Sequence, residues 1–260
     1  MNIVVCIKQV PGSTGIKLDP ETKQLIRDSA PAVINPFDYH ALEAAVRLRE
    51  EMGGEVIALS MGPAKAEAAL REALAFGADR AVLLNDRRFA GSDTWATSYV
   101  LAAAIRRLDG VNLVLCGRQA IDGDTAQVGP ELAAQLGWAQ ALNVAELQCR
   151  ADDLLVKRLL DDGYDRCLVR LPAVLGVVRE LNSPRVPTLN GYLRASAAGV
   201  TVWDAAAIHA DESRLGLQGS PTRVVGTAAA PPRAKRQKRL ALTQLNELLK
   251  ELDYAADNGK

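Results

Sequence analysis

The sequence VNLVLCGRQAIDGDTAQVGP, over Val111–Pro130, contains the clearest strand–loop–helix pattern of the chain. Its first part, Val111–Cys116, is a short apolar run that predicts a buried β-strand. A loop of small and polar residues follows, and it leads into a helical pattern from about Ala126 to Leu136. A buried strand that feeds directly into a helix is the repeating unit of a parallel sheet. This stretch therefore predicts an α/β fold.

The same alternation of strand and helix occurs before this stretch. Apolar runs predict buried strands over Ile3–Ile7, Val56–Leu59 and Ala81–Leu84. Helical patterns follow them over Asn35–Met52, Ala64–Phe76 and Asp93–Leu108. Short buried strands that alternate with helices predict a parallel sheet with helices on both faces. Such sheets bind ligands outside the carboxyl ends of their strands, often against a helix N-terminus.

After Val144 the pattern changes to short strands separated by Asp and Gly turns. These strands are expected to form a meander on the edge of the sheet, over Glu146–Arg150, Leu154–Leu160 and Arg166–Leu171. Pro172–Val178 predicts one more buried strand. We therefore expect one α/β domain over residues 1–195.

From about Ala195 the strand–helix rhythm is lost. Gly, Pro and Ala dominate Gly219–Pro232, a basic run covers Arg233–Arg239, and Leu242–Leu252 has leucines at helical spacing. We expect residues 196–260 to form a C-terminal arm whose terminal helix packs on another subunit.

The composition excludes several classes of function. The chain has 260 residues, 48% of them hydrophobic, and its 31 basic and 31 acidic residues give no net attraction to nucleic acid or to an anionic membrane. Its apolar runs are too short to cross a bilayer, and Met1–Ile7 lacks the features of a signal peptide. We expect a cytoplasmic protein without membrane insertion.

Cysteine and histidine usage argues against a metal centre. The four cysteines show no CxxC pairing and suggest buried free thiols in a reducing compartment. Two histidines, His40 and His209, cannot build a histidine-rich site. His40 is interpreted as a packed or solvated residue, and no Ser or Thr near a turn has a partner His, so no catalytic residue is expected.

The loop after Cys116 is the first candidate ligand site. Gly117 and Gly123 allow a tight turn or a close approach to a ligand, and Asp124 or Thr125 is expected to cap the helix. The free N–H groups of that helix would face a phosphate. Asp122 and Asp124 would repel a phosphate unless they point elsewhere, and a capped loop without a ligand explains the pattern as well. Neither GxGxxG after a strand nor GxxxxGK[ST] is present.

Two further loops are expected at the same edge of the sheet. Val33–Asp38 leads into a helix that Asn35 is expected to cap, with Pro36 at its first position. Met61-Gly62-Pro63 follows the second strand. If these loops share one edge with the loop after Cys116, they converge on one crevice, although each alone needs no ligand.

Several segments together resemble the electron transfer flavoprotein beta subunit over nearly the whole chain. The matching segments are Val5–Pro11, Ile34–Asp38, Ala73–Arg80, Gly117–Pro130 and Leu181–Leu189. The run GRQAIDGDTAQVGP over Gly117–Pro130 is the most specific of them. The resemblance implies a Rossmann-like fold and a heterodimer with an alpha subunit that holds the redox FAD.

The resemblance also implies an adenine nucleotide on this chain. In mitochondrial-type members this nucleotide is AMP, and the matching stretch has Asp-Asp-Cys-Asn-Gln-Thr. Here the stretch Gly123–Val128 has Gly-Asp-Thr-Ala-Gln-Val, and with Leu217–Thr222 it resembles members that carry a second FAD, including those that bifurcate electrons from NADH. FAD is therefore favoured over AMP.

The family's binding positions carry over to specific residues. Cys6, Asn35, Asp38 and Met61 would line the adenosine end of the nucleotide. The ribose and phosphates would be held by Asp122, Asp124, Thr125, Ala126, Gln127, Val128 and Gly129. Leu189 would dock on a partner dehydrogenase, although Asn190-Gly191-Tyr192 departs from the mitochondrial-type loop.

The sequence therefore predicts an electron carrier subunit rather than an enzyme. It would pass electrons between a dehydrogenase, or NADH, and a quinone oxidoreductase or a soluble acceptor. An adenine-nucleotide-hydrolysing enzyme with the same sheet is one alternative, but Lys8–Ser13 lacks the phosphate loop of such enzymes. A nucleotide-sensing module without flavin is another.

Overall fold

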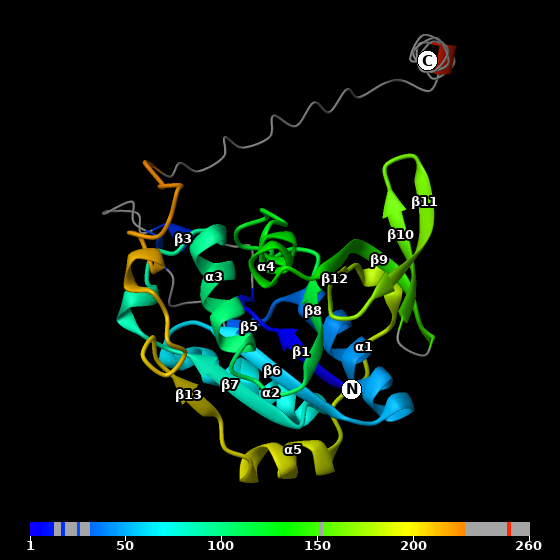
Figure 1. The fold of residues 1–260 in the computed structure, drawn as a ribbon, viewed down its shortest axis with the longest axis horizontal. Helices are drawn as coiled ribbons and strands as arrows, with labels where there is room; N and C mark the ends of the chain where they lie inside the picture. The colour runs from blue at the N-terminus through cyan, green and yellow to red at the C-terminus, as the bar shows by residue number, and fades with distance from the viewer. Residues whose placement is uncertain (13–16, 19–24, 27–31, 151–152, 227–248, 251–260) are drawn as a thin grey trace. The chain divides into compact units, whose positions relative to one another are not determined.

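The computed structural model describes residues 1–12, 17–18, 25–26, 32–150, 153–226 and 249–250 (Figure 1). A sheet of nine strands, in the order β11-β10-β9-β12-β8-β1-β6-β7-β13, forms the centre of residues 1–223. Its parallel strands are β1 (Asn2–Cys6), β6 (Glu55–Met61), β7 (Arg80–Leu84), β8 (Val111–Gly117), β12 (Ala173–Val177) and β13 (Thr201–Trp203). The predicted parallel α/β sheet is confirmed.

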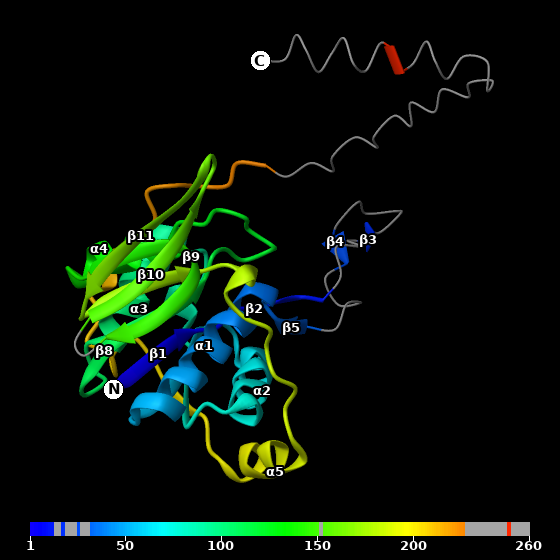
Figure 2. The same ribbon diagram turned by 90° about the vertical axis from the view of Figure 1, so that its right-hand side faces the viewer.

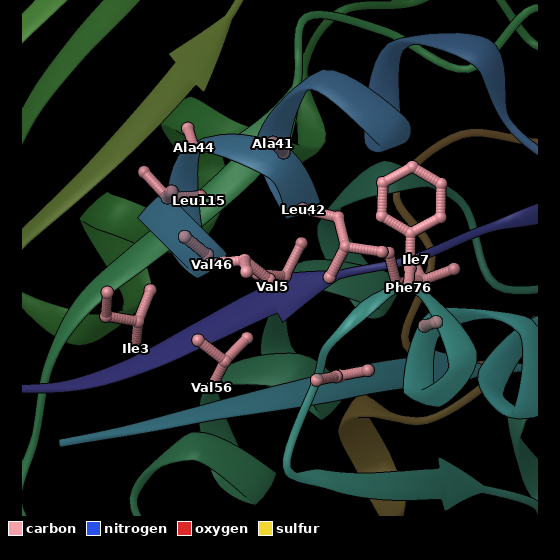
Figure 3. Packing of buried hydrophobic residues seen from close by; sticks show 14 of the residues in the cluster. Ile3, Val5, Ile7, Ala41, Leu42, Ala44, Val46, Val56, Phe76 and Leu115 are labelled. Atoms are coloured by element: carbon pink, nitrogen blue, oxygen red, sulfur yellow. The ribbon is translucent and has the colours of Figure 1, made fainter. Parts of the chain in front are cut away.

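Two layers of helices cover the sheet, one on each face. The helices are α1 (Pro36–Met52), α2 (Glu67–Phe76), α3 (Thr94–Ile105) and α4 (Val128–Leu136). Odd-numbered side chains of β1, such as Ile3 and Val5, pack with α1 and α2, whereas Val4 packs with α3 and α4. Figure 3 shows the first layer, in which Leu42 and Val46 of α1 meet Val5. Burial on both faces explains why the strands are continuous apolar runs.

The ends of these helices follow simple capping chemistry. Pro36 is the first residue of α1, and Gly53 and Gly77, both with positive φ, end α1 and α2. The Asp93 side chain accepts a hydrogen bond from Ala96 N at the start of α3. These four boundaries agree with the sequence. The helix expected from about Ala126 begins two residues later, at Val128.

The direction of winding reverses between β1 and β8. The chain passes from β1 to β6 and then to β7 on one side, and it returns to place β8 on the other side of β1. In open parallel sheets, ligands bind at such a reversal, in the crevice outside the carboxyl ends of the two strands. The loops after Cys6 and Gly117 meet at this position.

The predicted edge meander is present. It consists of β9 (Ala139–Arg150), β10 (Asp153–Leu160) and β11 (Gly163–Arg170), with antiparallel pairing of β10 to both neighbours. β9 starts earlier than expected because its first half pairs in parallel with β12.

Part of the expected C-terminal arm takes part in the α/β body. β13 pairs with β7, and Ala205, Ile208 and Leu215 lie in the core on the face of α3 and α4. The distribution of contacts along the chain divides it into one unit over residues 1–223 and a second unit, Val224–Lys260. The basic run and most of the terminal helix expected over Leu242–Leu252 lie outside the described residues, and the packing of this helix on another subunit stays a prediction.

Three features were missed from the sequence. A short antiparallel pair, β2 (Gln9–Pro11) and β5 (Ala32–Ile34), lies between β1 and α1. A second pair consists of β3 (Lys17–Leu18) and β4 (Leu25–Ile26). Helix α5 (Leu189–Ala197) lies beside α2 in both views (Figures 1 and 2).

Candidate functional site

The buried side chain of Asn35 joins the loops that follow β1 and β8. Its backbone N–H donates to Lys8 O at 2.8 Å, which fixes the residue against the end of β1. Its side-chain Nδ2 donates to Gln119 O at 2.9 Å, and its Oδ1 accepts from Ile121 N at 3.1 Å. Asn35 makes no side-chain cap of α1, so the expected capping role is wrong. The side chain instead shapes the loop after β8.

Asp38, in the first turn of α1, is the second buried polar residue of this junction. Its Oδ2 accepts from Lys8 N at 2.8 Å, and its Oδ1 accepts from Asn35 Nδ2 at 2.9 Å. Burial raises the pKa of the Asp38 carboxyl to about 7, against the lowering effect of hydrogen bonds from Asn35, Lys8 and the Gly117 backbone. The carboxyl group thus connects α1 to the ends of two strands.

Gly117 allows α1 to approach β8 closely. A Cβ atom at this position would lie 2.3 Å from Asp38 Oδ1 and 2.7 Å from the carbonyl carbon of Phe37. Both distances are far below a normal contact, so a side chain here would push α1 away from the strand. Gly117 is therefore needed for the close packing of β8 against the backbone of α1, and not for an unusual φ angle.

The loop between β8 and α4 is exposed and conformationally unusual. Asp122, Asp124, Thr125, Ala126 and Gln127 are all exposed. Asp124 and Ala126 have φ of 53° and 55°, in the left-handed region that costs a non-glycine residue about 1 kcal/mol. Asp124 N donates to Ala120 O at 2.8 Å, and its Oδ1 accepts from Gln119 Nε2. The loop therefore holds a defined shape while its outer surface stays open.

The N-terminus of α4 has no side-chain cap. Gln127 occupies the capping position and makes no side-chain hydrogen bond to the helix, so the expected capping by Asp124 or Thr125 is wrong. The N–H groups of the first turn, including those of Val128 and Gly129, have no acceptor inside the helix. These donors and the positive end of the helix dipole suit an anionic group.

The acidic residues of the loop are compensated within it. Lys8 Nζ lies 2.7 Å from Asp122 Oδ1, and the Gln119 side chain hydrogen-bonds Asp124. The expected repulsion between these carboxylates and a phosphate is thereby reduced. Neither Lys8 nor Gln119 was singled out from the sequence, although both belong to the segments that carry the resemblance.

Cys6 and Cys116 lie side by side near the carboxyl ends of β1 and β8, on the α3–α4 face of the sheet. They are partners in the pairing of β1 with β8, and both are free thiols. A hydrogen bond with Cys6 and burial raise the pKa of the Cys116 thiol well above its usual range. Met61 and Val128 pack against the same cluster, and a Cβ on Gly129 would lie 4.0 Å from the Cβ of Cys116. Small residues thus line the space under the start of α4.

Leu189 lies apart from this junction, as the first residue of α5. Its side chain is 76% exposed, and Val186, Tyr192 and Leu193 nearby are exposed as well. Gly191 lets α5 pack tightly, since a Cβ there would lie 2.2 Å from Ala75 O. The structure therefore presents an apolar surface around Leu189.

A polar strap holds the segment before α5 on α1. Arg185 donates to the buried carboxylate of Glu43 and to Glu50, with Nε–Oε2 and NH1–Oε1 distances of 2.8 and 2.7 Å. The imidazole Nδ1 of His40 lies 3.0 Å from Asn182 O, and Asn182 Nδ2 donates to His40 O. His40 is thus a structural residue, in agreement with its interpretation as a packed side chain.

Neither a metal-ligand cluster nor a membrane-spanning helix occurs among the described residues. No group of three or more His, Cys, Asp or Glu side chains is placed to hold a metal ion in this part of the chain. Among the helices described, none combines the length and apolar character needed to cross a membrane.

Comparison with known proteins identifies the class to which this fold and site belong. A family model described as the electron transfer flavoprotein domain matches residues 22–208. The chain belongs to the electron transfer flavoprotein family and, within it, to the beta subunits. The electron transfer flavoprotein subunit beta of Thermoanaerobacterium thermosaccharolyticum is 47% identical over 253 residues, which cover 97% of this chain and 96% of the relative.

Two other relatives carry different names. The caffeyl-CoA reductase-Etf complex subunit CarD of Acetobacterium woodii is 43% identical, with 95% of each chain covered. Protein FixA of Azorhizobium caulinodans is 45% identical, and the match covers 91% of this chain and 87% of FixA. Both matches extend over most of this chain and most of the relative.

Proposed function

We propose that this chain binds an adenine nucleotide in the crevice at the carboxyl ends of β1 and β8. The observation that carries the proposal is the junction made by Asn35, which fixes the loop after β8 so that it leads into an uncapped helix. The first-turn N–H groups of Val128 and Gly129 would hold a phosphate, with the dipole of α4 contributing favourably.

The remaining predicted site residues divide into three roles. Asn35 and Asp38 already use their side chains in the junction, so they would act by shaping the loops. Cys6 and Met61 would contact the adenosine end, largely through backbone and apolar atoms. The ribose and phosphates would be held by the exposed loop residues, namely Asp122, Asp124, Thr125, Ala126 and Gln127.

FAD is the favoured nucleotide, with AMP as the other candidate. The preference rests on the sequence Gly123–Val128, which lacks the more acidic pattern of AMP-carrying members. When bound, a flavin supplies the electron-transfer chemistry, and the protein supplies position, access and electrostatics.

The chain would act as an electron carrier subunit in a heterodimer with an alpha subunit. The heterodimer would take electrons from a dehydrogenase or from NADH and pass them to a quinone oxidoreductase or a soluble acceptor. A place in an electron-bifurcating complex is compatible with a relative named as a subunit of a caffeyl-CoA reductase-Etf complex. The exposed Leu189 would dock on the partner enzyme.

The test is a nucleotide count on the heterodimer co-purified with its alpha subunit. After denaturation, two FAD per heterodimer are expected, whereas one FAD and one AMP would support the nucleotide site but contradict the preference for FAD. Alanine at both Asp124 and Thr125 should lower the retained nucleotide by one equivalent. A colourless chain that is stable alone and hydrolyses ATP would contradict the electron-carrier function.

A further inference from the structure

Lys8 presents an ammonium group to the loop after β8 from a fixed backbone position. Its N–H donates to Asp38 Oδ2 at 2.8 Å, and its C=O accepts from Asn35 N at 2.8 Å. Its Nζ reaches Asp122 Oδ1 at 2.7 Å, in the loop that leads to α4. Buried residues thus hold both backbone polar groups of Lys8, while its side chain reaches the loop that leads to α4.

The ion pair between Lys8 and Asp122 is open to solvent. The two side chains are 49% and 34% exposed. Exposed pairs of this kind contribute little to stability, because solvent screens the charges and both side chains lose freedom. An anion that carries more charge can therefore replace Asp122 as the partner of the Lys8 ammonium group with little loss of stability.

A phosphate is such an anion. The phosphate monoester of AMP carries about −1.5 to −2 charges at neutral pH and offers three acceptor oxygens, and the pyrophosphate of FAD carries one charge on each phosphate, against one charge on Asp122. Charge-assisted hydrogen bonds from an ammonium to a phosphate are among the stronger polar contacts in proteins. A phosphate held at the start of α4 would also leave Asp122 repelled from it unless Lys8 lay between them.

We propose that Lys8 is a phosphate-binding residue that exchanges partners, from Asp122 in the nucleotide-free chain to the phosphate of the bound nucleotide. The proposal rests on the proposed nucleotide site and adds a determinant of its specificity. Lys8 would make the site select phosphorylated adenine compounds over the nucleoside. Asp122 would hold the lysine side chain in place until the phosphate arrives.

The test compares AMP with adenosine as ligands of the full-length chain, measured by isothermal titration calorimetry. Lys8→Met should weaken AMP binding about tenfold, in line with the loss of one charge-assisted hydrogen bond, and leave adenosine binding unchanged. Lys8→Arg should retain most of the AMP affinity because it keeps the charge.

Lys65→Met is the matched control, since Lys65 lies in the loop after the neighbouring strand β6 and is exposed. It should change AMP affinity less than about twofold. A wild-type chain that binds AMP, combined with equal AMP affinities for Lys8→Met and Lys65→Met, would overturn the role of Lys8 and leave the nucleotide site standing. An equal loss of AMP and adenosine in Lys8→Met would also overturn it. Failure of the wild-type chain to bind either ligand would contradict the nucleotide site itself.

Discussion

The Nδ2 atom of Asn35 lies 2.9 Å from Asp38 Oδ1, and both residues are almost completely buried at the start of α1. Through the same nitrogen Asn35 also reaches Gln119 O, 84 residues further along the chain. One amide therefore ties the helix after β1 to the loop after β8. The shape of the loop after β8 depends on this tie, because the Asn35 side chain also accepts a hydrogen bond from Ile121 N in that loop.

Replacement of Asn35 by Ala should be strongly destabilising. It removes the side-chain bonds to Asp38, Gln119 and Ile121 and leaves buried polar groups unpaired, at a cost of roughly 2–4 kcal/mol in the free energy of unfolding. Asn85→Ala is a suitable control because Asn85 makes one side-chain bond, to Gly62 O, at the same edge of the sheet. Urea unfolding should show a clearly smaller loss in the free energy of unfolding for the control. Equal losses in the two variants would contradict the role of Asn35 in the junction.

Gly117→Ala should damage both stability and nucleotide binding. The new methyl group would meet Asp38 Oδ1 at 2.3 Å, so α1 must shift, at a cost of about 1–3 kcal/mol. Gly123→Ala, in the same loop, has nothing within 4 Å of the new methyl group and should have little effect. Thermal unfolding and AMP titration of the two variants check this difference. A Gly117→Ala protein as stable as Gly123→Ala would show that the close approach is not needed.

The stability of the fold should fall as the pH rises toward neutrality. Burial raises the pKa of Asp38 to about 7 in the folded chain, whereas the unfolded value is near 3.9. Between these values the folded state holds one proton more than the unfolded state, so the free energy of unfolding decreases with pH by up to about 1.4 kcal/mol per unit. The contribution is complete below the unfolded pKa and is lost as the pH passes the folded one. Asp38→Asn should lack this part of the pH dependence, and an unchanged slope in the variant would refute the assignment.

Arg185→Met should loosen the strap that precedes α5. Burial opposes ionisation of Glu43, but hydrogen bonds from Arg185 and Arg47 keep its pKa below the usual value. Loss of Arg185 removes part of this support from a buried carboxylate and should cost roughly 1–3 kcal/mol. Arg179→Met is the control, because the Arg179–Glu180 pair is 77% and 46% exposed and should contribute little.

Limited proteolysis provides the second readout for the strap. Cleavage between Asn182 and Ala197 should become faster in Arg185→Met and stay unchanged in Arg179→Met. The affinity for the partner enzyme should fall with it if Leu189 is the docking residue. Identical cleavage rates in both variants would show that Arg185 does not hold the segment.

The sequence predicted the strands that are buried on both faces of the sheet. It also predicted the helix ends that are marked by residues at the ends themselves. The parallel strands are continuous apolar runs, and Gly53, Gly77 and Asp93 mark helix ends through their own backbone or side-chain preferences. The three-residue strand β13 was not predicted because its pairing with β7 depends on residues more than 100 positions away. Short pairs of this kind leave no periodic pattern in the sequence.

The loops after β1 and β8 were singled out from the sequence, but the contacts between them were not. The resemblance pointed to the loops after β1 and β8, and the structure joins them. The capping roles expected of Asn35, Asp124 and Thr125 were wrong, because tertiary contacts with Gln119 and Ile121 take the Asn35 side chain and α4 starts later. The role proposed for Lys8 depends on its contact with Asp122, 114 residues away, which no local pattern indicates.

Amide hydrogen exchange of the full-length chain with and without AMP tests the nucleotide site most directly. We expect bound AMP to slow exchange at the backbone amides from Gly117 to Gly129, above all at Val128 and Gly129 in the first turn of α4. Protection confined to other segments, with exchange over Gly117–Gly129 unchanged, would contradict the site.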